Sequence, residues 1–359
     1  MDEMTKTKLK ELGFNDFFNQ DLKNTISKES SIARVVSEYK EAYRVKDVYG
    51  EYLARVTGKH VFNATTRLDY PAVGDWVIIN KTDNEKATIQ KILPRKTILQ
   101  KKYSDKNDTQ IIATNIDVAF IVQSLDKDYS LNRFERYFVL ANEGGIKPTI
   151  VLNKTDLVTR EDLYKRIEEI KNRFINVDIL CSSSFTREGL QELIEYIKKG
   201  LTYCFIGSSG VGKSSLINKL LKSDIIQTNE ISATSGKGRH TTTTRELYVL
   251  ESGGIVIDNP GTREVGMVNA DIGIERVFEE IAALSRACKF SNCTHKQERG
   301  CAVTKALYDK TLDSQKYENY IKLKKENEYY EMTELEKKQK DRKLGQFIKK
   351  TMDQLREDV

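Results

Sequence analysis

The sequence GSSGVGKSS, residues 207–215, fits the phosphate-binding loop pattern G-x-x-x-x-G-K-[ST]. An apolar run at 201–206 precedes it and predicts a buried strand, and residues 214–221 predict a helix. In that context the glycines let backbone N–H groups approach phosphate, and the helix N-terminus adds a favourable dipole. The pattern therefore predicts binding of a nucleoside triphosphate. The residues expected to contact it from this loop are Gly207, Ser208, Ser209, Gly210, Val211, Gly212, Lys213, Ser214 and Ser215.

Magnesium is expected with the triphosphate. The Ser214 hydroxyl can bind the ion, and the neighbouring Lys213 ammonium can reach the β- and γ-phosphates. Residues 258–261, Asp-Asn-Pro-Gly, match D-x-x-G, in which the Asp258 carboxylate holds Mg²⁺ through water and the Gly261 N–H senses the γ-phosphate. The polar stretch GKGRHTTTT, residues 236–244, can supply a further ligand and a γ-phosphate contact. The residues expected at the magnesium ion are Ser214, Thr242, Thr243 and Asp258.

The catalytic water lacks its usual partner in this sequence. Many GTPases place a water-orienting Gln directly after the glycine of D-x-x-G, and here Thr262 follows Gly261. His240 is the nearest chemically suitable substitute and is our candidate catalytic residue. A role for His240 as a plain polar loop residue fits the sequence equally well.

The sequence Asn153-Lys154-Thr155-Asp156 predicts which base is bound. It follows the apolar run 148–152, a predicted strand, so its side chains lie at a strand end. A carboxylate there accepts hydrogen bonds from guanine N1–H and N2–H₂, whereas adenine offers no such donor pair and would leave it unpaired. We expect Asn153 to hold the loop and the Lys154 stem to cover the base. The residues expected around guanine are Asn153, Lys154, Thr155, Asp156, Ser183 and Ser184.

The order of these motifs is unusual. From residue 110 onward strands alternate with helices, which predicts a parallel sheet with its ligand loops at the carboxyl ends of the strands. The base-recognition residues precede the phosphate loop, whereas in ordinary GTPases the phosphate loop comes first. The sequence therefore predicts a circularly permuted P-loop GTPase domain over residues 110–268, whose D-x-x-G loop leads directly into the following domain.

Residues before this domain have a different sequence pattern. Short alternating runs punctuated by Gly, Asp and Asn span 33–105 and predict a small β-barrel with the OB fold, although another small β-domain would fit the same pattern. Basic residues near its end suit a nucleic-acid surface or a solvated face. Residues 1–32 predict a polar N-terminal extension with one short helix at 6–18, to which we assign no chemistry.

A cluster of possible metal ligands follows the GTPase domain. Cys288, Cys293, His295 and Cys301 have the spacing C-x4-C-x-H-x5-C, and three thiolates with one imidazole form a closed tetrahedral zinc set. A closed set indicates one structural Zn²⁺ per chain, because such a small segment has too little core to hold its shape alone. Residues 269–359 are therefore predicted to form a helical zinc-binding domain with a basic tail, which is either solvated or in contact with RNA phosphates.

Composition excludes some classes of protein. The 359-residue chain is 39% hydrophobic, carries a net charge of +6, and has no apolar run approaching the ~20 residues of a membrane span. Its first residues lack the apolar segment of a signal peptide. We expect a cytoplasmic, multidomain α/β protein without membrane contact, and a mildly basic surface that permits nucleic-acid binding.

Together, the predicted barrel, the permuted motif order, GRHTTT, DNPG and the Cys/His spacing resemble the RsgA/YjeQ group of ribosome-associated GTPases over roughly residues 33–310. The resemblance implies hydrolysis of GTP to GDP and phosphate, stimulated by the small ribosomal subunit, and a role in late maturation of that subunit. It also implies that the barrel and the zinc domain grip rRNA and that His240 assists catalysis. We expect a monomer.

Two other classes remain open from the sequence. One is a nucleotide-gated rRNA-binding module with negligible hydrolysis, which the missing Gln after Gly261 would allow. The other is a P-loop kinase or transport ATPase, against which Asp156 argues because it favours guanine.

Overall fold

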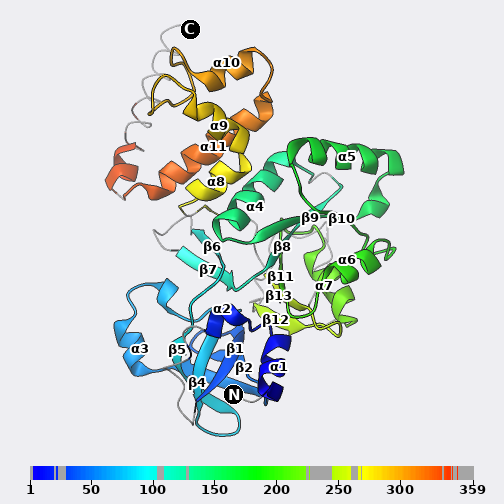
Figure 1. Ribbon diagram of the computed structural model, residues 1–359, viewed down its shortest axis with the longest axis vertical. Coiled ribbons are helices and arrows are strands. Elements are labelled where there is room, and N and C mark those ends of the chain that lie inside the picture. Colours follow the sequence, from blue (N-terminus) through cyan, green and yellow to red (C-terminus); the bar gives the residue numbers. More distant parts are fainter. Residues whose placement is uncertain are drawn as a thin grey trace. The chain divides into compact units, whose positions relative to one another are not determined.

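The structure is a computed structural model of the chain (Figure 1). It describes residues 3–19, 22, 30–102, 109–126, 129–223, 226, 245–259, 266–267, 269–333, 335–340, 342 and 346. The chain divides into two compact units, the first formed by residues 1–101 and 109–265 and the second by 102–108 and 266–359. No helix in the described ranges is long and apolar enough to cross a membrane.

A closed five-stranded barrel begins the first unit and confirms the predicted OB-like architecture. Its strands run in the order β1-β2-β3-β5-β4, and β1 pairs with β4 to close the circle, while β3 and β5 run parallel. Alternate side chains of the strands fill the interior with Val, Ile, Ala and Tyr. The bounds are β1 Ser30–Glu38, β2 Tyr43–Lys46, β3 Glu51–Val56, β4 Trp76–Lys81 and β5 Lys86–Ile92, with α3 Gly58–Asn63 and η1 Arg67–Asp69 between β3 and β4.

The N-terminal segment packs on the outside of this barrel. Instead of the single helix expected at 6–18 it forms α1 Glu3–Glu11 and α2 Asp16–Asn19, whose apolar residues pack against β1 and β4. Gly13 separates them with a φ of +89°, a left-handed conformation that ends a helix. Apolar residues of the segment, among them Phe14 and Phe18, bury against the Trp76 ring, so the segment is part of the fold.

The second part of the first unit is a mostly parallel sheet in the order β10-β9-β8-β11-β13-β12, with only β12 antiparallel. β11, the strand before the phosphate loop, lies between β8 and β13 although it follows β10 in the chain. The side chains of β8 and β11 are buried throughout, as expected for strands covered on both faces. The predicted permuted GTPase architecture is confirmed.

The bounds of this sheet and of its helices follow. The strands are β8 Val118–Ser124, β9 Lys147–Asn153, β10 Ile179–Cys181, β11 Thr202–Ile206, β12 Glu246–Val249 and β13 Ile255–Asp258. The helices are α4 Leu131–Glu143, η2 Thr155–Leu157, α5 Arg160–Arg173, α6 Leu190–Tyr196 and α7 Lys213–Leu221. α4 packs on β8 and β9, α6 on β10, and α7 on β13.

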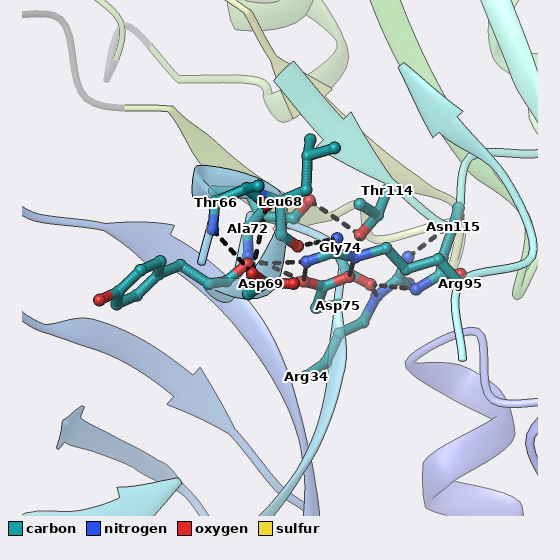
Figure 2. Close-up of polar contacts among 12 residues, drawn as sticks. Arg34, Thr66, Leu68, Asp69, Ala72, Gly74, Asp75, Arg95, Thr114 and Asn115 are labelled. Carbon is teal, nitrogen blue, oxygen red and sulfur yellow. Dashed lines mark hydrogen bonds and ion pairs between the residues drawn. The ribbon is translucent and has the colours of Figure 1, made fainter. Parts of the chain in front are cut away.

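The barrel and the parallel sheet are continuous. Ser37 of β1 pairs with Glu246 of β12, which makes one 11-stranded sheet, and the hairpin β6 Ile98–Lys102 with β7 Thr109–Thr114 connects the two parts along the chain. At the same junction, Figure 2 shows Arg34 beside Gly74 and Asn115, and Asp75 bonded to Arg95 and Thr114.

The described part of the second unit is helical. Residues 271–286 form two helices that meet at Phe278, where the backbone leaves helical geometry and the buried ring packs edge-on against Tyr320. The bounds are α8 Asp271–Val277, α9 Glu279–Arg286, α10 Ala302–Tyr308 and α11 Ser314–Glu331. The segment 287–301, with the predicted zinc ligands, contains neither helix nor strand.

Candidate functional site

The phosphate loop lies between β11 and α7, and its glycines are required by close approaches. A Cβ atom on Gly207 would lie 2.2 Å from the Val122 carbonyl oxygen of β8, and one on Gly212 would lie 2.3 Å from Asn153 Nδ2. Both residues also have positive φ angles, +148° and +94°. Any larger residue at either position would push the loop away from β8 or from the base-recognition loop.

Lys213 points back into the phosphate loop. Its Nζ donates to the carbonyl oxygens of Gly207 at 2.8 Å and of Ser208 at 2.6 Å, and the side chain is buried. This holds a cation inside the loop where the sequence predicts phosphate. Ser214 and Ser215 follow it in the first turn of α7.

Asp258 ends β13, which pairs with β11. Burial is the largest of the effects that raise the pKa of its carboxyl to about 6, the Glu246 carboxylate adds to the rise, and the Lys213 ammonium opposes it. Glu246 lies directly opposite in the β12–β13 register. A nearby cation stabilises the ionised form of a buried carboxyl, so this setting suits the predicted contact between Asp258 and Mg²⁺.

The base-recognition loop is bonded to the phosphate loop. The buried Asn153 donates from Nδ2 to the Val211 carbonyl at 2.8 Å, and the Ser182 hydroxyl lies 3.4 Å from Asn153 Oδ1. The Ser183 hydroxyl donates to Asp156 Oδ1 at 2.5 Å, which orients that carboxylate. The structure thus brings together two motifs that are more than 50 residues apart in the chain.

Sequence reasoning missed Asp126, whose Oδ2 lies 3.1 Å from Lys154 Nζ. The pair holds the Lys154 stem, and Lys154 itself has a left-handed backbone with a φ of 61°. Asp126 stands two residues after the end of β8, at the same edge of the sheet as the other loops. An acidic residue just beyond a buried parallel strand was the available signal.

The remaining predicted residues divide into two groups. Thr155 is buried at the start of η2, and Ser184 is half-buried next to the phosphate loop. Four others lie outside the described residues, namely His240, Thr242, Thr243 and Gly261.

In the second unit, the four predicted zinc ligands form one cluster whose ligand atoms all lie within 4.8 Å of one another. The Sγ atoms of Cys288 and Cys301 are 3.8 Å apart, and His295 Nδ1 lies 3.6 and 3.5 Å from them. A zinc tetrahedron with Zn–S near 2.3 Å and Zn–N near 2.0 Å has edges of about 3.8 and 3.5 Å. The spacing therefore fits a single metal ion.

The surroundings of this cluster also suit a metal. The Ser285 hydroxyl lies 3.0 Å from His295 Nε2, which leaves Nδ1 facing the thiols. Backbone N–H groups of Ala302 and Thr304 lie 3.4 Å from sulphur atoms of the cluster. Burial lowers the pKa of His295, which favours the neutral imidazole that a metal binds.

In the sequence, a closed barrel comes first, and the sheet that follows it has its base-recognition loop before its phosphate loop. This order defines a circularly permuted GTPase. Comparison with known proteins gives the family. Residues 92–268 match the family model described as RsgA GTPase. The chain belongs to the RsgA GTPase family and is a GTP-hydrolysing enzyme.

The relatives align along most of the chain. The protein named small ribosomal subunit biogenesis GTPase RsgA 2 from Lactiplantibacillus plantarum is 42% identical over 83% of this chain and 84% of its own length. The protein named small ribosomal subunit biogenesis GTPase RsgA 1 from Bacteroides thetaiotaomicron is 39% identical over 89% of this chain and 90% of its own length. The crystal structure of YjeQ from Thermotoga maritima matches with a TM-score of 0.62 at 28% identity, covering 83% of this chain and 98% of YjeQ.

Proposed function

We propose that this protein is a GTPase of small ribosomal subunit biogenesis whose hydrolysis of GTP to GDP and phosphate is accelerated by the subunit. The bond from Asn153 to Val211 carries the proposal, because it joins a guanine-specific loop to a phosphate loop in one site. The names of the relatives, which cover more than four fifths of the chain, supply the process. We propose further that the enzyme acts in the cytoplasm as a monomer.

In this proposal each motif contributes one interaction. Asp156 accepts from guanine, the loop at 207–215 surrounds the phosphates, and His240 orients the attacking water. Ser214, Asp258 and either Thr242 or Thr243 hold Mg²⁺, which neutralises charge on the phosphate oxygens. Cys288, Cys293, His295 and Cys301 hold a structural Zn²⁺ in the second unit.

The barrel offers a surface for rRNA. Phe62 of α3 is 89% exposed and Tyr49, between β2 and β3, is 71% exposed, while Arg44, Arg55 and Lys59 are exposed on the same barrel. Exposed rings and exposed cations on one barrel suit single-stranded RNA, because bases stack on such rings and phosphates pair with such cations.

The variant Asp156→Asn should bind GTP about 10- to 150-fold more weakly, because hydrogen bonds to a charged acceptor are worth roughly 1.5–3 kcal/mol. Discrimination against inosine triphosphate should narrow, since that base lacks the N2 amine the carboxylate recognises. Titration calorimetry measures both. Asp162→Asn is a matched control, because Asp162 is an exposed carboxylate on α5 bonded to Thr159. Equal GTP affinity in the two variants would remove Asp156 from the base site.

The process itself is tested by co-sedimentation with purified small and large ribosomal subunits, at fixed salt, in GDP and in a non-hydrolysable GTP analogue. We expect the protein to bind the small subunit, about 5- to 150-fold more tightly with the GTP analogue than with GDP. By linkage, the subunit must then increase the affinity for the analogue by the same factor. Preference for the large subunit would contradict the proposed function. Equal binding in both nucleotides would mean that GTP does not control attachment.

A further inference from the structure

Strand β1 belongs to the barrel and to the GTPase sheet at once. It pairs with β2 and β4 inside the barrel, and its Ser37 pairs antiparallel with Glu246 of β12. In an antiparallel register the next opposed residues are Glu38 and Arg245. They form an ion pair, with Arg245 Nη1 3.6 Å from Glu38 Oε2. Opposite charges at directly opposed positions stabilise a strand pair.

Arg245 is held by a second contact. Its Nη1 donates to the Ile111 carbonyl oxygen of β7 at 3.2 Å, and only 16% of the side chain is exposed. Burial raises the pKa of the Glu38 carboxyl, and the Arg245 guanidinium acts against that rise. The guanidinium is thus fixed at the junction of the barrel, β7 and β12.

The position of Arg245 in the chain gives this contact its importance. In the sequence it directly follows residues 236–244, the polar stretch predicted to contact the γ-phosphate, and it directly precedes β12. The next residue, Glu246, lies opposite Asp258, the predicted magnesium ligand. β12 pairs with β13 at four positions but with β1 at only one. β12 is therefore paired with the barrel over a shorter length than with β13, and the Glu38–Arg245 ion pair lies next to that one paired position.

We propose that Arg245 is a positioning residue for subunit-stimulated GTP hydrolysis: with Glu38 it fixes the start of β12, the strand that pairs with Asp258, to the barrel. RNA bound to the barrel then acts on Asp258, the predicted magnesium ligand, through β1, this ion pair and β12. Arg245 touches neither nucleotide nor water in this scheme. The inference rests on the proposed function, because it requires that a ribosomal subunit stimulates turnover.

The test compares GTP turnover with and without small subunits in four variants. Arg245→Gln and Glu38→Gln remove the ion pair, and Arg245→Lys retains the charge. Glu51→Gln is the control, because Glu51 pairs with Lys46 at 3.1 Å on the same barrel, between β2 and β3. Subunit-stimulated kcat should fall at least fivefold in both Gln variants at the junction and stay within twofold of wild type in Arg245→Lys and Glu51→Gln.

Three further readouts separate positioning from folding. In the Gln variants at the junction, GTP affinity, basal turnover and melting temperature should stay close to wild type. The double variant should lose no more stimulation than either single variant, since both remove one interaction. If small subunits stimulate GTP turnover equally in the wild type and in Arg245→Gln, this inference alone is overturned. Equal losses of basal and stimulated turnover in the Gln variants at the junction would also overturn it. If subunits do not stimulate turnover of the wild-type protein, the proposed function is overturned as well.

Discussion

Replacing Cys293 with serine should remove zinc from the protein and unfold the segment 287–301. That segment has neither helix nor strand, so its shape depends on the ligand cluster. Structural zinc binding contributes about 10–16 kcal/mol in small domains, far more than the few buried side chains of this segment can replace. Elemental analysis should find one zinc per chain in the wild-type protein and less than a tenth of that in Cys293→Ser.

Cys181→Ser is the matched control, since Cys181 lies in β10 of the first unit, outside the cluster. It should retain zinc. The Cys293→Ser variant should keep its GTP affinity, because the phosphate and base loops belong to the first unit, and retention of GTP binding shows that the remainder of the chain is folded. Wild-type protein purified without chelator and free of zinc would contradict the metal assignment.

The motifs at the ends of strands could be predicted from the sequence because each is recognised from residues that are neighbours in the chain. A phosphate loop needs a strand before it and a helix after it, and both are legible in residues 201–221. Asn153 and Asp156 follow an apolar run, which places them at the same edge of the sheet. The order of these motifs therefore predicted the permuted sheet, and the alternating runs of 33–105 predicted the barrel.

Contacts between distant segments could not be predicted in this way. Arg34 stands in an alternating strand, where a charged residue is normally taken as solvent-facing, yet it is 1% exposed because its partners are carbonyl groups from other segments. The N-terminal extension is polar in composition, but Leu9, Leu12, Phe14 and Phe18 are buried in one cluster with Trp76. Phe278 interrupts a helical pattern because its ring is needed in the core of the second unit.

Arg34 connects four segments of the first unit. Its Nη1 donates to the Leu12 carbonyl at 2.6 Å, its Nε to that of Gly74 at 3.3 Å, and its Nη2 to the Asn115 carbonyl at 3.2 Å and the Thr202 hydroxyl at 2.9 Å. These atoms belong to the N-terminal segment, the barrel, the turn before β8, and β11. Figure 2 shows the barrel side of this arrangement, where Gly74 and Asn115 meet the guanidinium.

The group stays charged despite its burial. Loss of solvation lowers the pKa of Arg34 to about 10, and the carboxylates of Asp117 and Asp75 act against that fall. At neutral pH the guanidinium therefore still donates all four bonds. Asp75 is itself held by Arg95 at 2.7 Å and by the Thr114 hydroxyl at 2.7 Å, so the negative charge near Arg34 is fixed in place.

The variant Arg34→Met should lose about 3–5 kcal/mol of unfolding free energy, because methionine fills part of the space but removes the donor from the Leu12 and Asn115 carbonyls and from the Thr202 hydroxyl, while the Gly74 carbonyl keeps Asn115 Nδ2. Urea denaturation followed by tryptophan fluorescence measures this well. The chain has one tryptophan, Trp76, and the Arg34 guanidinium lies 5.5 Å from its ring centre. Arg44→Met, on the exposed face of β2, is the matched control and should change stability by no more than about 0.5 kcal/mol. A loss in Arg34→Met below about 1 kcal/mol would mean that the cost of burying the guanidinium nearly cancels its four bonds.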